Sequence, residues 1–263
     1  WEFLPVGNGD LAAPVWTPTP DSVEFNLNKN DTWEGDQLRA CGRLTLHLGA
    51  DLMNGDDFRG RLDLHQAIAS LEGRTGAGHA NISSYVDANS NVLVIRHRGE
   101  TRAPVERRIE LSLWREEGVQ VGARDRDIWL KQKFPDRSYA LACRIVGAKY
   151  TAESRPEDRL TTIQIAPARK ADFTVLLAAV TSTEPGVNPL EEARKLLDAT
   201  EARTMEITTE EHKDWWRNFW RQSFVSLSDD YLENLWYLTI YNLACTSRGE
   251  FPVKFNGGLW LWQ

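Results

Sequence analysis

The sequence predicts a mainly β protein, with a large β-sandwich over residues 1–183 followed by helices. Two observations in the first part predict strands: polar and apolar residues alternate in short runs, and Gly, Asn, Asp and Pro separate these runs. After residue 189 the apolar residues recur at helical spacing instead. Runs of strands followed by runs of helices indicate separate layers or domains, and they argue against alternating βαβ units.

Within the first part, the alternating runs define the expected strands. These are residues 22–27, 43–48, 92–97, 105–113, 139–146, 161–165 and 173–180. Residues 87–91, Asp-Ala-Asn-Ser-Asn, predict a turn. Residues 62–71 fit either a short helix or a strand by pattern alone, and the family resemblance described below favours a strand.

Three helices are expected after the sandwich. Asn188, Pro189 and the acidic pair at 191–192 predict the first helix start. The second is expected to begin near Thr208 or Thr209, with Glu210 and Glu211 in its first turn. The third is expected to begin at residues 228–230, Ser-Asp-Asp, and to end before Gly249 and Pro252.

Composition excludes several functional classes. The 263 residues carry a net charge of −7 and are 41% hydrophobic, enough to bury a sizeable core. No apolar run approaches the roughly 20 residues that cross a bilayer, so no membrane partner is expected. The negative charge argues against nucleic acid as a partner. Arginines are dense between residues 96 and 108, but Glu100, Glu106 and Glu110 interleave with them, which predicts a solvated strand face.

The cysteines and histidines give no sign of a metal or cofactor site. The cysteines are far apart, odd in number and without a CxxC pair, so buried free thiols are expected at Cys41, Cys143 and Cys245. The histidines lack metal-ligand spacing and are expected on strand faces or the surface; they are His47, His65, His79, His97 and His212. We therefore expect neither a metal nor another cofactor.

Two loops near the N-terminus could bind a ligand. In residues 5–12, Gly7 and Gly9 permit positive φ angles, while Asn8 and Asp10 supply an amide and a carboxylate. The alternative interpretation of this loop is a simple hairpin turn. Both loops are expected at one end of the sandwich, because the roughly twenty residues between them suit an outgoing and a returning strand.

The second loop, residues 28–35, places the indole of Trp33 beside Asp31 and neighbouring amide and hydroxyl groups. Proteins grip sugars in this way, with the ring on an aromatic face and the hydroxyls on polar groups. The alternatives are an Asp-capped turn or a Trp packed at a domain interface. No carboxylates are spaced as a catalytic acid and base, so no catalytic residue is assigned.

Tryptophan is concentrated near the C-terminal end of the sequence. Six of the eleven tryptophans lie there: Trp215, Trp216, Trp220, Trp236, Trp260 and Trp262. We expect that these indoles cannot all be buried, which would leave an exposed apolar patch and allow self-association. The chain is accordingly interpreted as the front part of a larger enzyme.

Several of these segments together resemble bacterial glycoside hydrolases related to family 95, the inverting α-fucosidase group. The N-terminal pair is Pro-Val-Gly-Asn-Gly-Asp at 5–10 and Asn-Lys-Asn-Asp-Thr-Trp-Glu-Gly at 28–35. The chain is similar in particular to an uncharacterised branch that opens with a domain of unknown function. Residues 215–227 resemble the connector before the helical barrel of such enzymes. Residues 256–260, Asn-Gly-Gly-Leu-Trp, depart from the fucosidase pattern, so fucose is not carried over as the substrate.

The resemblance implies a β-supersandwich at 1–183, a helical linker at 184–227 and the first part of a truncated (α/α)6 barrel at 228–263. It implies an exo-acting, inverting glycoside hydrolase of periplasmic or extracellular location, whose catalytic residues lie in a C-terminal catalytic domain beyond residue 263. The present chain alone is expected to be inactive. The candidate substrate-binding residues, at the rim of the carbohydrate pocket, are Asn8, Asp10, Asp31, Trp33 and Trp260. The alternatives are a non-catalytic carbohydrate-binding sandwich and the front domain of a glycoside phosphorylase.

Overall fold

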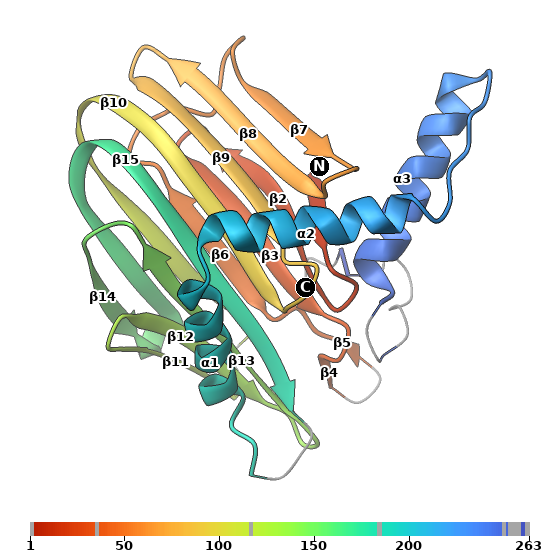
Figure 1. Ribbon diagram of the computed structural model, residues 1–263. Coiled ribbons are helices and arrows are strands. Elements are labelled where there is room, and N and C mark those ends of the chain that lie inside the picture. The colour runs from red at the N-terminus through yellow and green to blue at the C-terminus, as the bar shows by residue number, and fades with distance from the viewer. Residues whose placement is uncertain are drawn as a thin grey trace.

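The computed structural model describes residues 3–34, 37–115, 118–182, 186–248, 251 and 259–260. In this part of the chain one 13-stranded antiparallel sheet and one two-stranded sheet are joined to three α-helices (Figure 1). The mainly β prediction is confirmed. None of the described helices is long and apolar enough to span a membrane.

The bounds of the elements follow the chain in order. The strands are β1 (Leu4–Gly7), β2 (Leu11–Thr19), β3 (Ser22–Lys29), β4 (Trp33–Glu34), β5 (Gln37–Leu38), β6 (Gly42–His47), β7 (Arg59–Asp63), β8 (Ile68–Thr75), β9 (Gly78–Val86), β10 (Val92–Ser112), β11 (Val119–Arg124), β12 (Asp127–Lys133), β13 (Ser138–Val146), β14 (Tyr150–Arg155) and β15 (Leu160–Ser182). A short 3-10 turn at Pro156–Asp158 precedes β15, and the helices are α1 (Pro189–Ala202), α2 (Met205–Trp220) and α3 (Asp230–Thr246).

The two longest strands, β10 and β15, belong to both layers of the sandwich. The first half of β10 pairs with β9 and with the second half of β15, which continues to β13, β12 and β11. The second half of β10 pairs with β6 and with the first half of β15, which also carries β14. The pairing of β10 with β15 is irregular between Glu100 and Arg107, where one layer passes into the other. The main apolar core includes side chains from strands of both layers.

Two pairs of expected strands are therefore single strands. Residues 92–97 and 105–113 both belong to β10 apart from Leu113, and residues 161–165 and 173–180 both belong to β15. Between these runs, residues 98–100 of β10 pair with residues 170–172 of β15, and the register then shifts. Residues 62–71 form neither one strand nor a helix. They include the end of β7, a turn and the start of β8.

The arginine-rich part of β10 is only partly the solvated face that was predicted. Arg98 and Arg102 are exposed, but His97 and Arg107 are fully buried, in phase with Ile95 and with the core residues that follow. Strand alternation turns every second side chain inward whatever its chemistry, and here it places two basic groups inside. The thiols of Cys41, Cys143 and Cys245 are free and buried, as expected.

Helix α1 covers the outer face of the layer that contains β13 and β15. Its Leu190, Ala193 and Leu197 pack on outward-facing residues of those strands, such as Ala142 and Leu176. Both faces of these strands are therefore buried, which explains their continuous apolar runs. The predicted start is confirmed, because the Asn188 side chain accepts a hydrogen bond from the Leu190 amide nitrogen at 3.1 Å.

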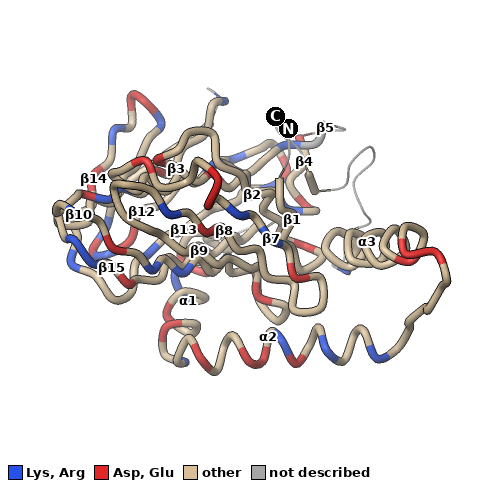
Figure 2. The backbone as a smooth tube through the Cα atoms, turned by 90° about the horizontal axis from the view of Figure 1, so that it is seen from above, with Lys and Arg blue, Asp and Glu red and all other residues tan. Residues whose placement is uncertain are grey.

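Helices α1 and α2 lie on the same side of the sheet (Figure 2). The predicted start of α2 is wrong by about one turn. The helix begins at Met205 because Thr204 caps it, with the Thr204 hydroxyl accepting a hydrogen bond from the Ile207 amide nitrogen. Helix α3 begins as predicted after Asp229, whose carboxylate caps the first turn, and it ends at Thr246. Gly249 and Pro252 lie outside the described residues.

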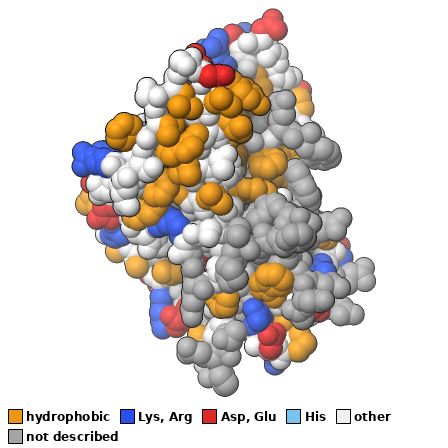
Figure 3. Space-filling model, turned by 90° about the vertical axis from the view of Figure 1, so that its right-hand side faces the viewer, with side chains coloured by type: hydrophobic (Ala, Val, Ile, Leu, Met, Phe, Trp, Pro, Cys, Tyr) orange, Lys and Arg blue, Asp and Glu red, His pale blue; other side chains and the backbone are white. Residues whose placement is uncertain are grey.

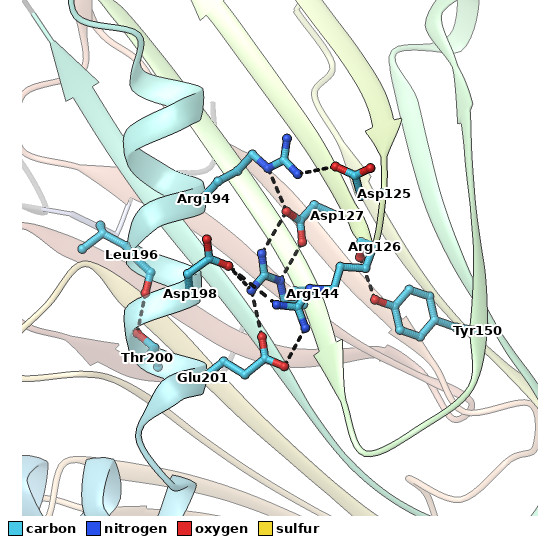
Figure 4. Close-up of polar contacts among 10 residues, drawn as sticks. All are labelled: Asp125, Arg126, Asp127, Arg144, Tyr150, Arg194, Leu196, Asp198, Thr200 and Glu201. Atoms are coloured by element: carbon cyan, nitrogen blue, oxygen red, sulfur yellow. Dashed lines mark hydrogen bonds and ion pairs between the residues drawn. The ribbon is translucent and has the colours of Figure 1, made fainter.

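A network of ion pairs fixes α1 to the sheet (Figure 4). The Arg144 guanidinium on β13 contacts the Asp127 carboxylate at 2.7 Å, and both side chains are buried. The same guanidinium contacts Asp198 at 2.7 Å and Glu201 at 2.8 Å, both on α1. Arg194 of α1 reaches the other Asp127 oxygen at 3.0 Å. Burial disfavours the charged form of Arg144, but the hydrogen bonds that its guanidinium donates to these carboxylates raise its pKa overall.

Candidate functional site

Four segments distant in sequence meet where α3 ends, and we call this region the loop junction. It consists of the turn at 7–10 between β1 and β2, residues 28–33 from the end of β3 to the start of β4, the turn at 87–91 between β9 and β10, and residues 245–248 at the end of α3. The turn predicted at 87–91 is confirmed. The two N-terminal loops lie side by side, because the Asn30 amide nitrogen donates to the Asp10 carbonyl oxygen at 2.9 Å.

Asn8 holds the junction together from its centre. Its side-chain nitrogen donates to the carbonyl oxygens of Asp87 at 3.1 Å and Ser90 at 2.9 Å and contacts Asn91 Oδ1 at 3.0 Å. Its oxygen accepts from the amide nitrogens of Asp10 and Leu11. The side chain is buried and its donors and acceptor are engaged by protein. Asn8 therefore fixes the geometry of the loops around it.

A buried lysine joins the two candidate carboxylates. Lys29 Nζ lies 2.5 Å from Asp10 Oδ2 and 3.5 Å from Asp31 Oδ1. Asp10 also accepts a hydrogen bond from Asn91 Nδ2 at 2.6 Å. Each carboxylate side chain remains partly exposed, whereas the lysine is buried. Because one cation contacts both acids, Lys29 holds the two carboxylates close together.

The end of α3 is bonded directly to both loops. The Gly9 amide nitrogen donates to the Cys245 carbonyl oxygen at 2.9 Å, and the Arg248 amide nitrogen donates to the Gly9 carbonyl oxygen at 3.3 Å. The Asn30 side-chain nitrogen donates to the Thr246 carbonyl oxygen at 3.0 Å and also to Gly9. These bonds satisfy carbonyl groups that a helix end leaves without helical partners.

Glycine is required at two positions of the junction because the end of α3 approaches so closely. Gly9 has a φ of +92°, and a Cβ there would lie 2.1 Å from Arg248 Cβ. A Cβ on Gly7 would lie 2.7 Å from the Cys245 carbonyl oxygen. The prediction of a positive φ is thus confirmed for Gly9 and wrong for Gly7, where close contact with α3 explains the residue.

The two candidate tryptophans lie in different settings. Trp33 is half-buried at the start of β4, and its indole nitrogen donates to the Asn30 carbonyl oxygen at 2.8 Å. Arg137 fixes the same loop by donating to the Asp31 carbonyl oxygen at 2.8 Å. Trp260 is also half-buried and packs near Phe3, with ring centroids 6.3 Å apart.

Sequence reasoning missed Arg248, which completes the junction. Its guanidinium carbon lies 3.4 Å from the ring centroid of Trp215, and Nη2 donates to the Ala88 carbonyl oxygen at 2.9 Å. Burial lowers the pKa of Arg248 to about 10, so the side chain still carries a charge at neutral pH. A basic residue just beyond a helix C-terminus was the available signal, because cations favour that end of the helix dipole.

Helix α2 is anchored beside the junction by His212. Its Nδ1 accepts from the Ala88 amide nitrogen at 3.1 Å, so Nε2 carries the proton and donates to the Gln66 carbonyl oxygen at 2.8 Å. Burial lowers the pKa of His212 to about 4, and the ring is neutral at physiological pH. The expectation of an exposed or strand-face histidine is wrong here, because His212 is a buried helix residue.

The exposed apolar patch differs in composition from the one predicted. Trp216 and Trp220 are buried, and Trp215, Trp236 and Trp260 are half-buried, while Trp262 lies outside the described residues. The exposed apolar side chains instead belong mainly to α3 and the segment before it: Phe224, Leu227, Tyr231, Leu232, Leu235, Leu238 and Leu243. The indoles pack against one another and the sheet, whereas these leucines are exposed. Figure 3 shows apolar side chains gathered on this side of the molecule.

The junction supplies groups for recognition more than for catalysis. The described residues contain no group of three or more His, Cys, Asp and Glu that could hold a metal ion. Asp87 has a pKa raised by burial, but its carboxylate accepts a hydrogen bond from the Ser90 hydroxyl and caps its own turn. What the junction offers a ligand is the half-buried Trp33 beside the partly exposed carboxylates of Asp10 and Asp31.

The fold defines the class: a two-layer β-sandwich followed by helices. Residues 2–144, more than half of the chain, match the family described as "Domain of unknown function (DUF5703)", in its N-terminal part. The chain belongs to this family. No curated protein matches it significantly.

Two solved structures share the fold at low sequence identity. A putative kojibiose phosphorylase from the human microbiome superposes with a TM-score of 0.65 at 11% identity, covering 92% of this chain and 39% of that one. A bacterial glucoamylase complexed with acarbose superposes with a TM-score of 0.51 at 12% identity, covering 92% of this chain and 40% of that one. The chain thus spans about two fifths of the length of each.

Proposed function

We propose that this chain is the N-terminal region of a carbohydrate-active enzyme, a glycoside hydrolase or a glycoside phosphorylase. The similarity in fold to a phosphorylase and a glucoamylase supports the proposal, and so does the share of their length that the chain spans. In this proposal residues 184–227 link the sandwich to a catalytic domain, and residues 228–263 are the first part of its helical barrel. A relation to family 95, exo action, inversion and a periplasmic or extracellular location are finer parts of the same proposal.

One observation supports the proposal that the sandwich contributes to the pocket rim. Its two N-terminal loops are hydrogen-bonded to the end of α3. Gly9 bonds to Cys245 and Asn30 bonds to Thr246, so the loops keep a fixed position relative to the helix that would begin the barrel. Trp33, Asp10 and Asp31 are then held as a rigid part of the pocket rim. Asn8 supports them from beneath, and Trp260 is the proposed contribution from the barrel side.

The exposed side of α3 supports a helical domain as the next neighbour. Leu232, Leu235 and Leu243 lie on this face and are about half exposed, while Tyr241 and Ala244 on the opposite face are buried. A helix that is apolar on both faces is typical of a position between two packed layers. We propose that the helices following in the longer protein cover this face. When they are absent, it mediates self-association.

Catalysis is assigned to residues beyond this chain. An inverting hydrolase needs an acid and a base roughly 6.5–9.5 Å apart, with room for a water molecule. Asp10 and Asp31 both contact Lys29 Nζ, at 2.5 and 3.5 Å, which places their carboxylates too close together for that arrangement. The chain alone is accordingly expected to be inactive. The phosphorylase alternative rests on the fold shared with the putative kojibiose phosphorylase.

The test uses the full-length protein and a panel of aryl glycosides and oligosaccharides, each with and without inorganic phosphate. Phosphate-dependent turnover identifies a phosphorylase, and phosphate-independent release identifies a hydrolase. Trp33→Ala should raise KM at least about tenfold through loss of ring stacking. Trp114→Ala is the matched control, because Trp114 is similarly accessible at 38% exposure but stacks with Arg43 at the end of β10. Absence of any activity in the full-length protein, with sugar binding retained, would support the non-catalytic alternative instead.

A further inference from the structure

A second polar site lies inside the sandwich, where β10 and β15 pass from one layer to the other. Arg107 on β10 is only 1% exposed. Its Nη1 donates to the carbonyl oxygens of Ala168 at 3.0 Å and Val105 at 3.3 Å. Its Nε and Nη2 have no hydrogen-bond partner among the described residues. These two nitrogens share one edge of the guanidinium, the edge that grips an oxyanion in a fork.

The buried charge of Arg107 lacks a protein counterion in the described part of the chain. The one acid that lines the adjoining cavity, Asp172, is shared by Arg96 at 3.6 Å and Arg98 at 3.4 Å. A buried guanidinium without a carboxylate is costly, because desolvation is not offset by an opposite charge. Burial accordingly lowers the pKa of Arg107 below its usual value. A bound anion would supply the missing charge and two hydrogen-bond acceptors.

Arg107 lines a cavity of about 250 Å³ that suits a compact ligand. The remaining wall comes from residues 147–149, before β14, and from the middle of β15. Lys149 and Lys170 are exposed members of this wall, so the lining carries three cations and one carboxylate that is already paired. Ligand pockets for drug-sized molecules start at about 300 Å³, so this space fits a small group.

The neighbourhood of the cavity adds no competing charge. His97 stacks on Phe173, which lines the cavity, with ring centroids 4.7 Å apart. Burial and the Arg107 charge lower the pKa of His97 to about 3, so its ring is neutral. In Figure 1 the bend of β10 and β15 lies on the side of the sheet away from α3. The cavity is therefore separate from the loop junction.

We propose that this cavity binds a compact oxyanion, a sulfate, phosphate or carboxylate group, either free or as a substituent of a sugar. The Nε and Nη2 edge of Arg107 grips two of its oxygens, and Lys149 and Lys170 attract it at the entrance. Bidentate arginine contacts are typical of recognition of such groups. The inference does not depend on the proposed enzymatic role of the loop junction.

Isothermal titration calorimetry of the purified protein tests the proposal at constant ionic strength. The titrants are sodium sulfate, sodium phosphate, acetate and glucuronate, with glucose as the uncharged control. Saturable binding of at least one anion, and none of glucose at this site, is expected. Tighter binding of glucuronate than of acetate indicates a sugar-borne group, and tighter binding of the inorganic ions indicates a free anion. No saturable binding of any of the four would overturn the proposal.

Two variants test whether the anion binds at Arg107. Arg107→Met removes the charge but keeps an unbranched side chain of similar shape, so the fold should persist. Its anion affinity should fall at least about tenfold, equivalent to about 1.4 kcal/mol. Arg102→Met is the matched control, since Arg102 is on the same strand but is exposed and does not line the cavity. Equal affinity in wild type and Arg107→Met would rule out this site.

A surface variant keeps the test decisive if Arg107→Met does not fold. Lys149→Gln combined with Lys170→Gln changes only exposed side chains and should leave the fold intact. It should weaken anion binding about threefold or more and reduce the dependence of binding on salt, because two screened charges are lost. Unchanged affinity and unchanged salt dependence in this double variant would contradict the proposal.

Discussion

The amide nitrogen of Gly9 and the carbonyl oxygen of Cys245 lie 2.9 Å apart and form a hydrogen bond between the first hairpin and the last described helix. This bond joins residues at opposite ends of the sequence. The glycine is essential to it, since a Cβ would lie 2.1 Å from Arg248 Cβ and the φ of +92° disfavours other residues.

Gly9→Ala should separate the end of α3 from the loops. Strain of about 1–3 kcal/mol is expected from the positive φ alone, and the clash adds to it. Urea unfolding measures the loss, and hydrogen exchange of residues 241–246 should accelerate in the variant. Gly76→Ala is the control, because a Cβ there meets nothing within 4 Å and should leave both measurements unchanged.

Lys29→Met should destabilise the junction by about 2–4 kcal/mol, since it leaves two carboxylates close together without their cation. Lys29 is 2% exposed, whereas the Asp10 side chain is 26% exposed. The expected loss of stability is therefore smaller than for a fully buried ion pair. A double-mutant cycle with Asp10→Asn isolates the pair, and the coupling energy should be about 1–3 kcal/mol. Lys195→Met removes an exposed ion pair and should leave stability almost unchanged. A coupling energy near zero would show that Asp10 and Lys29 act independently.

In the network between α1 and the sheet, the Arg144 guanidinium contacts two carboxylates, Asp127 and Asp198, that differ in exposure. Asp127→Ala should cost about 3–5 kcal/mol, because Asp127 and Arg144 are both buried. Asp198→Ala should cost less than about 1 kcal/mol, since that side chain is 63% exposed and water replaces it. Chemical denaturation of the two variants makes the comparison, and equal losses would contradict the assignment of burial as the cause.

Acid should weaken the attachment of α2 through His212. Its pKa is about 4 in the folded protein against an ordinary 6.5, because burial disfavours the charged ring. The unfolded state therefore binds the additional proton between pH 6.5 and 4, so stability falls as pH is lowered through that window. The full effect is about 3 kcal/mol. Protonation would also place an N–H of Nδ1 against the Ala88 amide.

The measurement is the free energy of unfolding of wild type and His212→Gln between pH 7 and 4.5. The variant should be less stable at pH 7 but should show a shallower decline with falling pH. His97, with a pKa of about 3, contributes a similar slope to both proteins and cancels in the difference. Parallel pH profiles would mean that His212 titrates normally in the folded state.

The outward face of α3 should cause association of the chain expressed alone. Leu235→Gln combined with Leu238→Gln changes two residues that are 47% and 42% exposed, so it should lower the apparent mass at high concentration without loss of helix. Light scattering coupled to size exclusion measures the mass and circular dichroism the helix. A wild-type chain that stays monomeric at all concentrations would contradict the proposed interface.

The sequence determined those features that depend on neighbouring residues. The alternation of polar and apolar residues predicted β3, β6 and β13, and the polar run at 87–91 predicted its turn. Asn188 and Asp229 predicted two helix starts. These predictions succeeded because capping and strand alternation act over a few residues. The same local reasoning missed the continuity of β10 and β15. Their polar middle segments resemble loops until each is paired with the other.

Only the tertiary structure decided which polar groups meet. Lys29 between Asp10 and Asp31, Arg248 over Trp215, and Asn8 against the turn at 87–91 all join residues brought together by strand order and by the approach of α3. The burial of Arg107 was likewise hidden, since its sequence neighbours are charged and exposed. Burial depends on which layer covers a face, and that is a property of the folded sheet, not of any short stretch of chain.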